Sequence, residues 1–166
     1  RLARLIATAP VSSSSHPEAR PLSPAPPARP HEGLRVLVAD DEMTNRQILR
    51  RLLTREGCAI LEASDGLEAV ELFARNRPDC VLLDVMMPGM DGIEACRRIK
   101  QASQADFVPV IFITALYREE DLVRCIAAGG DDFIGKPVSG AVLSAKMTAL
   151  DRIRRLHATV RVQSDE

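Results

Sequence analysis

Aromatic residues are scarce in this sequence, and tryptophan is absent. Aromatics make up 3% of the 166 residues whereas hydrophobic residues make up 46%, so any core must be built mainly from aliphatic side chains. The sequence lacks the run of about 20 apolar residues that a membrane-spanning helix needs, and no signal peptide is recognisable at its start. A formal net charge of −1 argues against direct nucleic-acid binding, because domains with that function are usually strongly basic.

Cysteines are few and do not have the spacing of a metal site. All four lie within apolar segments: Cys58, Cys80, Cys96 and Cys125. We predict that they are buried, reduced thiols, as expected of a cytoplasmic protein. Because the sequence starts at Arg1 rather than at a methionine, we expect it to be a piece of a longer protein.

The first 33 residues differ in composition from the rest. Proline and serine dominate from about residue 9 to residue 33, and too little apolar surface is present to offset the entropy of ordering the chain. We therefore predict a disordered, partly extended linker over residues 1–33, and we assign no role to His31 within it. The first six residues are either the tail of a preceding domain, such as a sensor kinase, or a free extension.

From Leu34 onward, apolar stretches of strand length alternate with amphipathic stretches of helical length, which is typical of a parallel sheet flanked by helices. The predicted strands are residues 36–38, 58–63, 81–83, 108–113 and 132–135. The predicted helices are residues 44–56, from 64–66 to 76, from 91–92 onward, 118–128 and from 139 onward. We assign residues 34–150 to one domain and residues 151–166 to an extension of its last helix. The third strand is apolar throughout and is predicted to be central, with both faces buried.

The first and last helices carry more detailed predictions. Thr44 is expected to cap the first helix, whose inner face is predicted to hold Ile48, Leu49, Leu52 and Leu53. In the last helix, apolar residues recur every three or four positions, at Val142, Leu143, Met147, Leu150, Ile153, Leu156 and Val160. This stripe outruns the domain. It favours pairing with a second copy in a two-helix coil, although packing on its own sheet or fraying would also account for it.

Polar residues stand where the predicted strands end. They are Asp40, Asp41, Asp84, Thr114 and Lys136. Because the carboxyl ends of parallel strands meet at one edge of a sheet, we predict that these side chains converge. Three carboxylates repel one another unless a cation binds, and Mg²⁺ suits hard oxygen ligands. Asp84 could then attack phosphorus to form an aspartyl phosphate, while Lys136 and Thr114 stabilise the transferred oxygens.

Each of these residues alone also has an ordinary structural interpretation. Asp40 and Asp41 could favour the start of a helix through its dipole, and Asp84 could cap a loop. Thr114 could be a strand-end residue whose hydroxyl has no functional role, and Lys136 could be a surface lysine. The functional interpretation depends on all five standing at strand ends, in an order that one topology brings together.

The stretch from about residue 35 to residue 157 resembles the receiver domain of two-component response regulators. The resemblance is carried by four segments, residues 36–42, 81–92, 110–115 and 127–137. It implies an α/β fold with a doubly wound, flavodoxin-like sheet of five parallel strands in the order 2-1-3-4-5. It also implies a signalling switch that depends on phosphorylation.

The resemblance further implies a role for each residue of the site. Asp84 would be the phosphoacceptor, and Asp41 and Asp84 would bind Mg²⁺ directly. Asp40 would act on the metal through water, and Met86 would offer its backbone carbonyl. Thr114 and Lys136 would bind the phosphoryl group. Phe133 would be the aromatic switch residue, whose side chain moves when Thr114 moves. The Lys136–Pro137 bond would be cis.

A histidine kinase or phosphotransfer protein would be the phosphodonor, and a fused or partner output domain would receive the signal. Phosphorylation would change the face formed by the fourth helix, the fifth strand and the last helix. We expect no enzyme activity beyond the domain's own phosphorylation and dephosphorylation. The strongest rival is a Mg²⁺-dependent phosphohydrolase with Asp40 as nucleophile, and a third possibility is a receiver that signals unphosphorylated.

Overall fold

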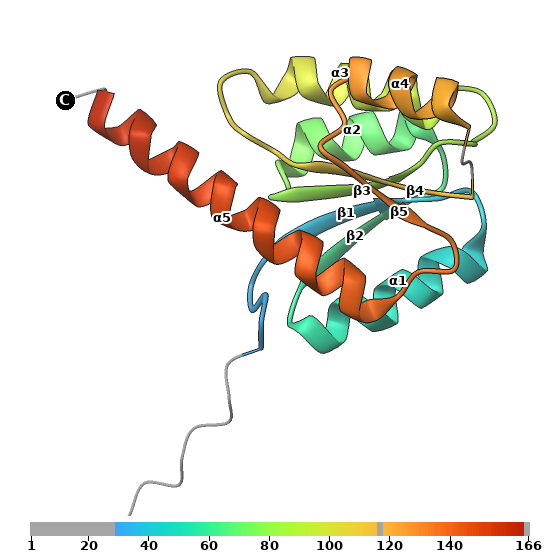
Figure 1. Ribbon diagram of the computed structural model, residues 1–166, viewed down its shortest axis with the longest axis horizontal. Helices are drawn as coiled ribbons and strands as arrows, with labels where there is room; N and C mark the ends of the chain where they lie inside the picture. The colour runs from blue at the N-terminus through green and yellow to red at the C-terminus, as the bar shows by residue number, and fades with distance from the viewer. Residues whose placement is uncertain (1–28, 116–117, 165–166) are drawn as a thin grey trace, which may run out of the picture.

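Five parallel strands form a single sheet in the order β2-β1-β3-β4-β5, which confirms the predicted flavodoxin-like topology. The computed structural model describes residues 29–115 and 118–164 (Figure 1), so most of the predicted linker, residues 1–28, lies outside the described residues. The strands are β1 (Arg35–Ala39), β2 (Ala59–Ala63), β3 (Cys80–Asp84), β4 (Val110–Thr114) and β5 (Asp132–Gly135).

Helices cover both faces of the sheet. They are α1 (Met43–Glu56), α2 (Gly66–Asn76), α3 (Gly92–Ser103), α4 (Glu119–Ala127) and α5 (Gly140–Ser164). Figure 1 shows α1 and α5 on one face and α2, α3 and α4 on the other. This arrangement follows from the alternation of strand and helix, because each crossover between parallel strands places its helix on a face of the sheet.

The core has two layers because successive residues of a strand point to opposite faces. Leu37 and Leu83 pack with the α2–α3 side, whereas Val36 and Leu82 pack with the α1–α5 side. Every residue of β3 is buried, as its continuous apolar sequence predicted. The thiols are all free; three are buried and Cys58 is half-buried.

The structure corrects two predictions for α1. Thr44 is not the N-cap: the helix begins at Met43, and the capping residue Glu42 makes no side-chain capping bond. Instead the Asp40 carboxylate accepts a hydrogen bond from the Glu42 amide, at 2.9 Å, and so fixes the turn that leads into the helix. Ile48, predicted to face inward, is 46% exposed, because the buried stripe of α1 is narrow and centres on Leu49 and Leu53.

The last helix runs well past the sheet. Leu143, Met147 and Leu150 are buried against the domain, but Val142, predicted to lie on the same stripe, is exposed. Figure 1 shows the C-terminal half of α5 projecting beyond the strands. No helix in the part of the chain described by the structure combines the length and apolarity needed to cross a bilayer.

The structure also changes the interpretation of His31. Its side chain is 5% exposed, although the sequence suggested only a linker residue. Its Nδ1 lies 2.7 Å from Glu56 Oε2, and its Nε2 lies 3.1 Å from Thr148 Oγ1. The residues immediately before β1 therefore pack on the end of α1 and on α5.

Candidate functional site

The register of the sheet brings the predicted polar residues to one edge. Ala39 pairs with Leu83 and Asp84 with Ile113, so the residue after Ala39 lies level with the end of β3. Thr114 pairs with Gly135, immediately before Lys136. An open cavity of about 890 Å³ lies at this edge, and its lining includes Asp41, Asp84, Thr114, Lys136, Met86 and Asn45.

Three carboxylates meet beside this cavity. One oxygen from each of Asp40, Asp41 and Asp84 lies within 4.8 Å of the others. Asp40 is 1% exposed and Asp84 is 6% exposed, whereas Asp41 is exposed to solvent. The two adjacent aspartates therefore differ in environment: Asp40 is buried beside the cavity, and Asp41 lines it.

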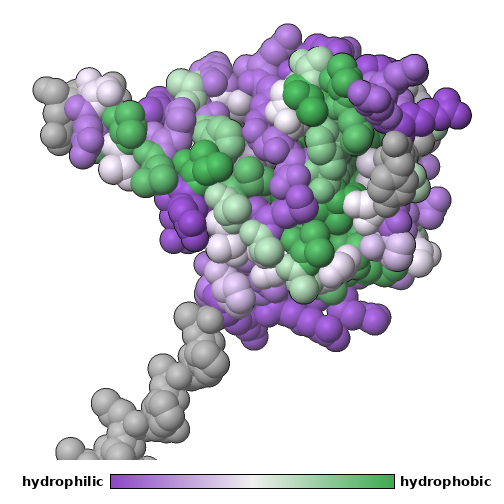
Figure 2. Space-filling view, in the orientation of Figure 1, coloured by the Kyte–Doolittle hydropathy of each residue, from purple (hydrophilic) through white to green (hydrophobic). Residues whose placement is uncertain are grey.

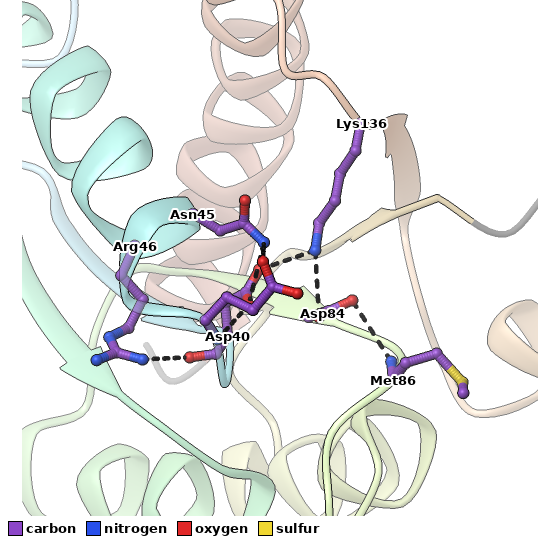
Figure 3. Close-up of polar contacts among 7 residues, drawn as sticks. Asp40, Asn45, Arg46, Asp84, Met86 and Lys136 are labelled. Atoms are coloured by element: carbon purple, nitrogen blue, oxygen red, sulfur yellow. Dashed lines mark hydrogen bonds and ion pairs between the residues drawn. The ribbon is translucent and has the colours of Figure 1, made fainter.

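Lys136 connects two of the carboxylates. Its Nζ lies 2.9 Å from Asp40 Oδ2 and 3.2 Å from Asp84 Oδ2 (Figure 3). Burial lowers the pKa of the ammonium, but the hydrogen bonds and negative charges of Asp40 and Asp84 outweigh that effect and raise the pKa overall. Lys136 is therefore a charged lysine held at the cavity.

The contact with Lys136 does not fully stabilise the negative charge of the Asp84 carboxylate. Burial raises the pKa of its carboxyl, and the charge of Asp40 raises it further. Lys136 and the amide of Met86 lower it only in part. The Met86 amide donates to Asp84 Oδ1 at 3.4 Å, a long hydrogen bond. The ionised form of Asp84 would therefore be stabilised by an additional positive charge.

Sequence reasoning missed two residues that hold the β1–α1 turn. The Arg46 Nη1 donates to the Asp40 carbonyl at 2.7 Å. The Asn45 Nδ2 lies 3.4 Å from Asp40 Oδ1 and 3.2 Å from Glu42 Oε2. The available signal was a pair of donor side chains in the first helical turn after the acidic residues, where they can reach back to the strand end.

Thr114 and Phe133 lie on the neighbouring strands β4 and β5, where Thr114 pairs with Gly135 and Phe133 pairs with Phe112. Thr114 is buried and lines the cavity, and its carbonyl accepts a hydrogen bond from the Lys136 amide at 3.1 Å. Phe133 is half-buried, and its ring stacks on Phe112 with centroids 6.0 Å apart. The Lys136–Pro137 peptide is cis, as expected.

The donor set fits a small, hard cation. Three carboxylates lie close together and a single lysine lies against them, so negative charge exceeds positive charge within the cluster. Mg²⁺ commonly uses one or two protein carboxylates and keeps waters that a phosphate can replace. Asp41 and Asp84, which line the open cavity, are the residues placed to hold such an ion.

A doubly wound parallel domain with an acidic cation site and a lysine at its carboxyl edge defines the class of protein. The model of the response regulator receiver domain family matches residues 36–148, and the chain belongs to this family. It is therefore a receiver domain of a two-component system, which is a signalling domain.

Known relatives agree with this assignment. The chain is 44% identical over 119 residues to the response regulator MprA of Mycobacterium sp. (strain KMS), with 72% of this chain and 51% of that protein covered. It is 40% identical over 120 residues to the response regulator PleD of Caulobacter vibrioides (strain NA1000 / CB15N), with 72% and 26% covered. The chain thus spans about half of the MprA relative and about a quarter of PleD.

Solved structures show the same fold. The crystal structure of the CheX-CheY-BeF3-Mg+2 complex from Borrelia burgdorferi matches with a TM-score of 0.66 and 32% identity, covering 73% of this chain and 97% of that chain. The signal receiver domain of a signal transduction histidine kinase from Syntrophus aciditrophicus matches with a TM-score of 0.64 and 36% identity, covering 71% and 89%.

Proposed function

We propose that this domain is a switch that accepts a phosphoryl group on Asp84 in the presence of Mg²⁺. The observation that carries the proposal is the meeting of Asp40, Asp41 and Asp84 within 4.8 Å, with Lys136 contacting two of them. The similarity to a family member crystallised with BeF3 and Mg²⁺ supports it. The phosphodonor would be a histidine kinase or a phosphotransfer protein.

In this proposal each side chain has one task. A carboxylate oxygen of Asp84 attacks phosphorus, the bond to the donor's leaving group breaks, and an acyl phosphate forms. Lys136 binds an oxygen of the transferred group, and the Thr114 hydroxyl donates to another. Asp41, Asp84 and the Met86 carbonyl would hold the cation, and Asp40 would contribute through a water. A bound Mg²⁺ would supply positive charge that offsets the charge developing on the phosphoryl oxygens.

The conformational part of the switch would follow from Thr114. Movement of its side chain toward the phosphoryl group leaves space beside β4, and Phe133 turns into that space from β5. The surface of α4, β5 and α5 then changes shape, which alters its affinity for an output domain. The output domain is either fused to this chain or a separate partner.

One experiment separates this switch from the rival phosphohydrolase. The protein is incubated with Mg²⁺ and a small phosphodonor such as acetyl phosphate, and both the protein mass and the released phosphate are followed. The switch predicts a mass increase of one phosphoryl group per chain. Multiple turnovers that persist in Asp84→Asn but disappear in Asp40→Asn would establish the hydrolase instead.

Mg²⁺ is expected to raise the midpoint temperature of thermal unfolding. An ion that binds only the folded state stabilises it by about 2.7 kcal/mol at 100 times its dissociation constant, which corresponds to a shift of several degrees. Asp41→Asn should remove most of this shift because it removes an exposed ligand. Asp121→Asn, an aspartate of α4 outside the cavity, is the matched control. Equal shifts in all three proteins would contradict the proposed metal site.

We also propose that α5 mediates self-association through its outward apolar side chains. Ile153, Leu156 and Val160 are 48%, 61% and 61% exposed, at the spacing of a two-helix coil. Figure 2 shows apolar surface along the projecting part of the molecule.

Truncation after Arg155 removes two of these side chains and should weaken any dimer at least tenfold in analytical ultracentrifugation, whereas Arg152→Ala should not. Unchanged self-association after truncation would refute the coil.

A further inference from the structure

The projecting part of α5 turns two arginines and a histidine toward its own domain. Arg154, His157 and Arg161 are spaced three and four residues apart and therefore lie on one side of the helix. These three side chains line a cavity of about 440 Å³ between α5 and the domain. Ile153, Leu156 and Val160 are exposed apolar side chains of the same turns.

Each of the three inward side chains has a partner in a loop at the amino end of the sheet. An Arg154 Nη1 lies 3.5 Å from Asp79 Oδ1 in the α2–β3 loop. The His157 ring lies 6.1 Å, between centroids, from that of Phe107 in the α3–β4 loop. Arg161 forms an ion pair with Asp106 in the same loop.

One of these loop partners is hydrogen-bonded to the sheet, and another contacts a side chain of α3. The Asp79 carboxylate accepts a hydrogen bond from the Arg35 amide at 2.9 Å, at the start of β1. Lys100 Nζ lies 5.3 Å from the centroid of the Phe107 ring and donates to the Val108 carbonyl at 2.8 Å. Asp79 and Phe107 are therefore braced by the domain, whereas Asp106 is an exposed side chain.

We propose that Arg154–Asp79, His157–Phe107 and Arg161–Asp106 form a clasp that makes α5 part of the folded receiver as far as Arg161. The turns after Leu150 continue a helix that is already packed on the domain through Leu143, Met147 and Leu150, and the end of such a helix frays unless tertiary contacts hold it. The clasp supplies such contacts. It also sets the direction in which α5 leaves the domain, and it leaves the apolar side of the helix open.

The contacts of the clasp are weak enough to be broken without unfolding the domain. Ion pairs at the surface are individually weak and are screened by salt. Its contacts lie at the end of the sheet opposite the acidic cavity, since Asp106 and Phe107 precede β4 whereas Thr114 ends it. A ligand or partner that displaces the α3–β4 loop would therefore free the C-terminal end of α5 without entering the acidic cavity at the opposite end of the sheet. This inference does not depend on phosphorylation of Asp84.

Hydrogen exchange of the whole chain, read by mass spectrometry on peptides covering residues 152–164, tests the clasp. Arg161→Ala and Asp106→Ala should each speed exchange about threefold, and Asp106→Ala with Phe107→Ala together about tenfold. The charge-exchanged pair Asp106→Arg with Arg161→Asp should restore part of the protection. Arg152→Ala, an exposed arginine of the same helix that lines a different cavity beside His31, should have no effect.

Two further readings make the outcome decisive. Exchange of the β3 and β4 amides should stay as in wild type, which shows that the variants fold. If the loop variants disturb these strands, Arg161→Ala still tests the clasp, because it changes only a side chain on the exposed part of α5. Wild-type exchange rates in Arg161→Ala and in the loop variants would overturn the clasp. Protection of residues 152–164 that vanishes on dilution would also overturn it, because a second copy would then be its source.

Discussion

Asp84→Asn is expected to abolish incorporation of phosphate from acetyl phosphate, while the protein stays folded. The amide that replaces the carboxylate is a poor nucleophile, so the proposed acyl phosphate cannot form. Intact-protein mass spectrometry after incubation with Mg²⁺ should show one added phosphoryl group in wild type and none in the variant. Asp121→Asn should label like wild type. Full labelling of Asp84→Asn would place the phosphoacceptor elsewhere.

The same substitution should stabilise the protein in the absence of divalent cations. Burial and the charge of Asp40 hold the pKa of Asp84 above its usual value, so ionised Asp84 costs stability in the folded state. This cost is fully present above the raised pKa and disappears below the ordinary pKa. At neutral pH Asp84→Asn should therefore unfold at a higher temperature than wild type in EDTA. The combination of lost labelling and higher stability distinguishes loss of the nucleophile from general misfolding.

Gly92→Ala is expected to have the largest effect on stability. Gly92 is the first residue of α3, and a Cβ there would lie 1.9 Å from the backbone oxygen of Asp84 and 2.9 Å from the Cα of Val85. Both are backbone atoms, so no side chain can move to relieve the overlap. We expect a loss of about 3 kcal/mol in the free energy of unfolding, measured by urea denaturation. Phosphate labelling should also fall, because the displaced backbone carries Asp84.

Gly89→Ala is the matched control in the same loop. Gly89 has a φ of +74° but nothing within 4 Å of the position of an added Cβ. Its substitution should cost roughly 1 kcal/mol, from backbone conformation alone, and labelling should persist. If Gly92→Ala were no more destabilising than Gly89→Ala, the close approach of α3 to the end of β3 would not be essential to the fold.

The elements could be predicted from local patterns because local physics sets them. Continuous apolar runs in residues 81–83 and 110–113 mark buried parallel strands, and Asp65 and Asp91 begin helices because each accepts the capping hydrogen bond. Prediction failed at the start of α1, where a different local contact replaced the expected cap. Thr44 is a suitable cap in isolation, but the Asp40 carboxylate bonds the amide of Glu42, and α1 starts one residue earlier.

The sequence by itself determined the strand and helix order and the residue types at the strand ends, because periodicity and side-chain chemistry are local properties. Only the tertiary structure decided that Asp40 is buried against Lys136 while Asp41 faces the cavity, and that Arg46 reaches back to β1. It also decided that α5 turns its arginines toward its own domain. The physical reason is that the orientation of a polar side chain can depend on a partner far away in the chain, as for Asp40 and Lys136, which are 96 residues apart. The position of such a partner is set only once the sheet has formed.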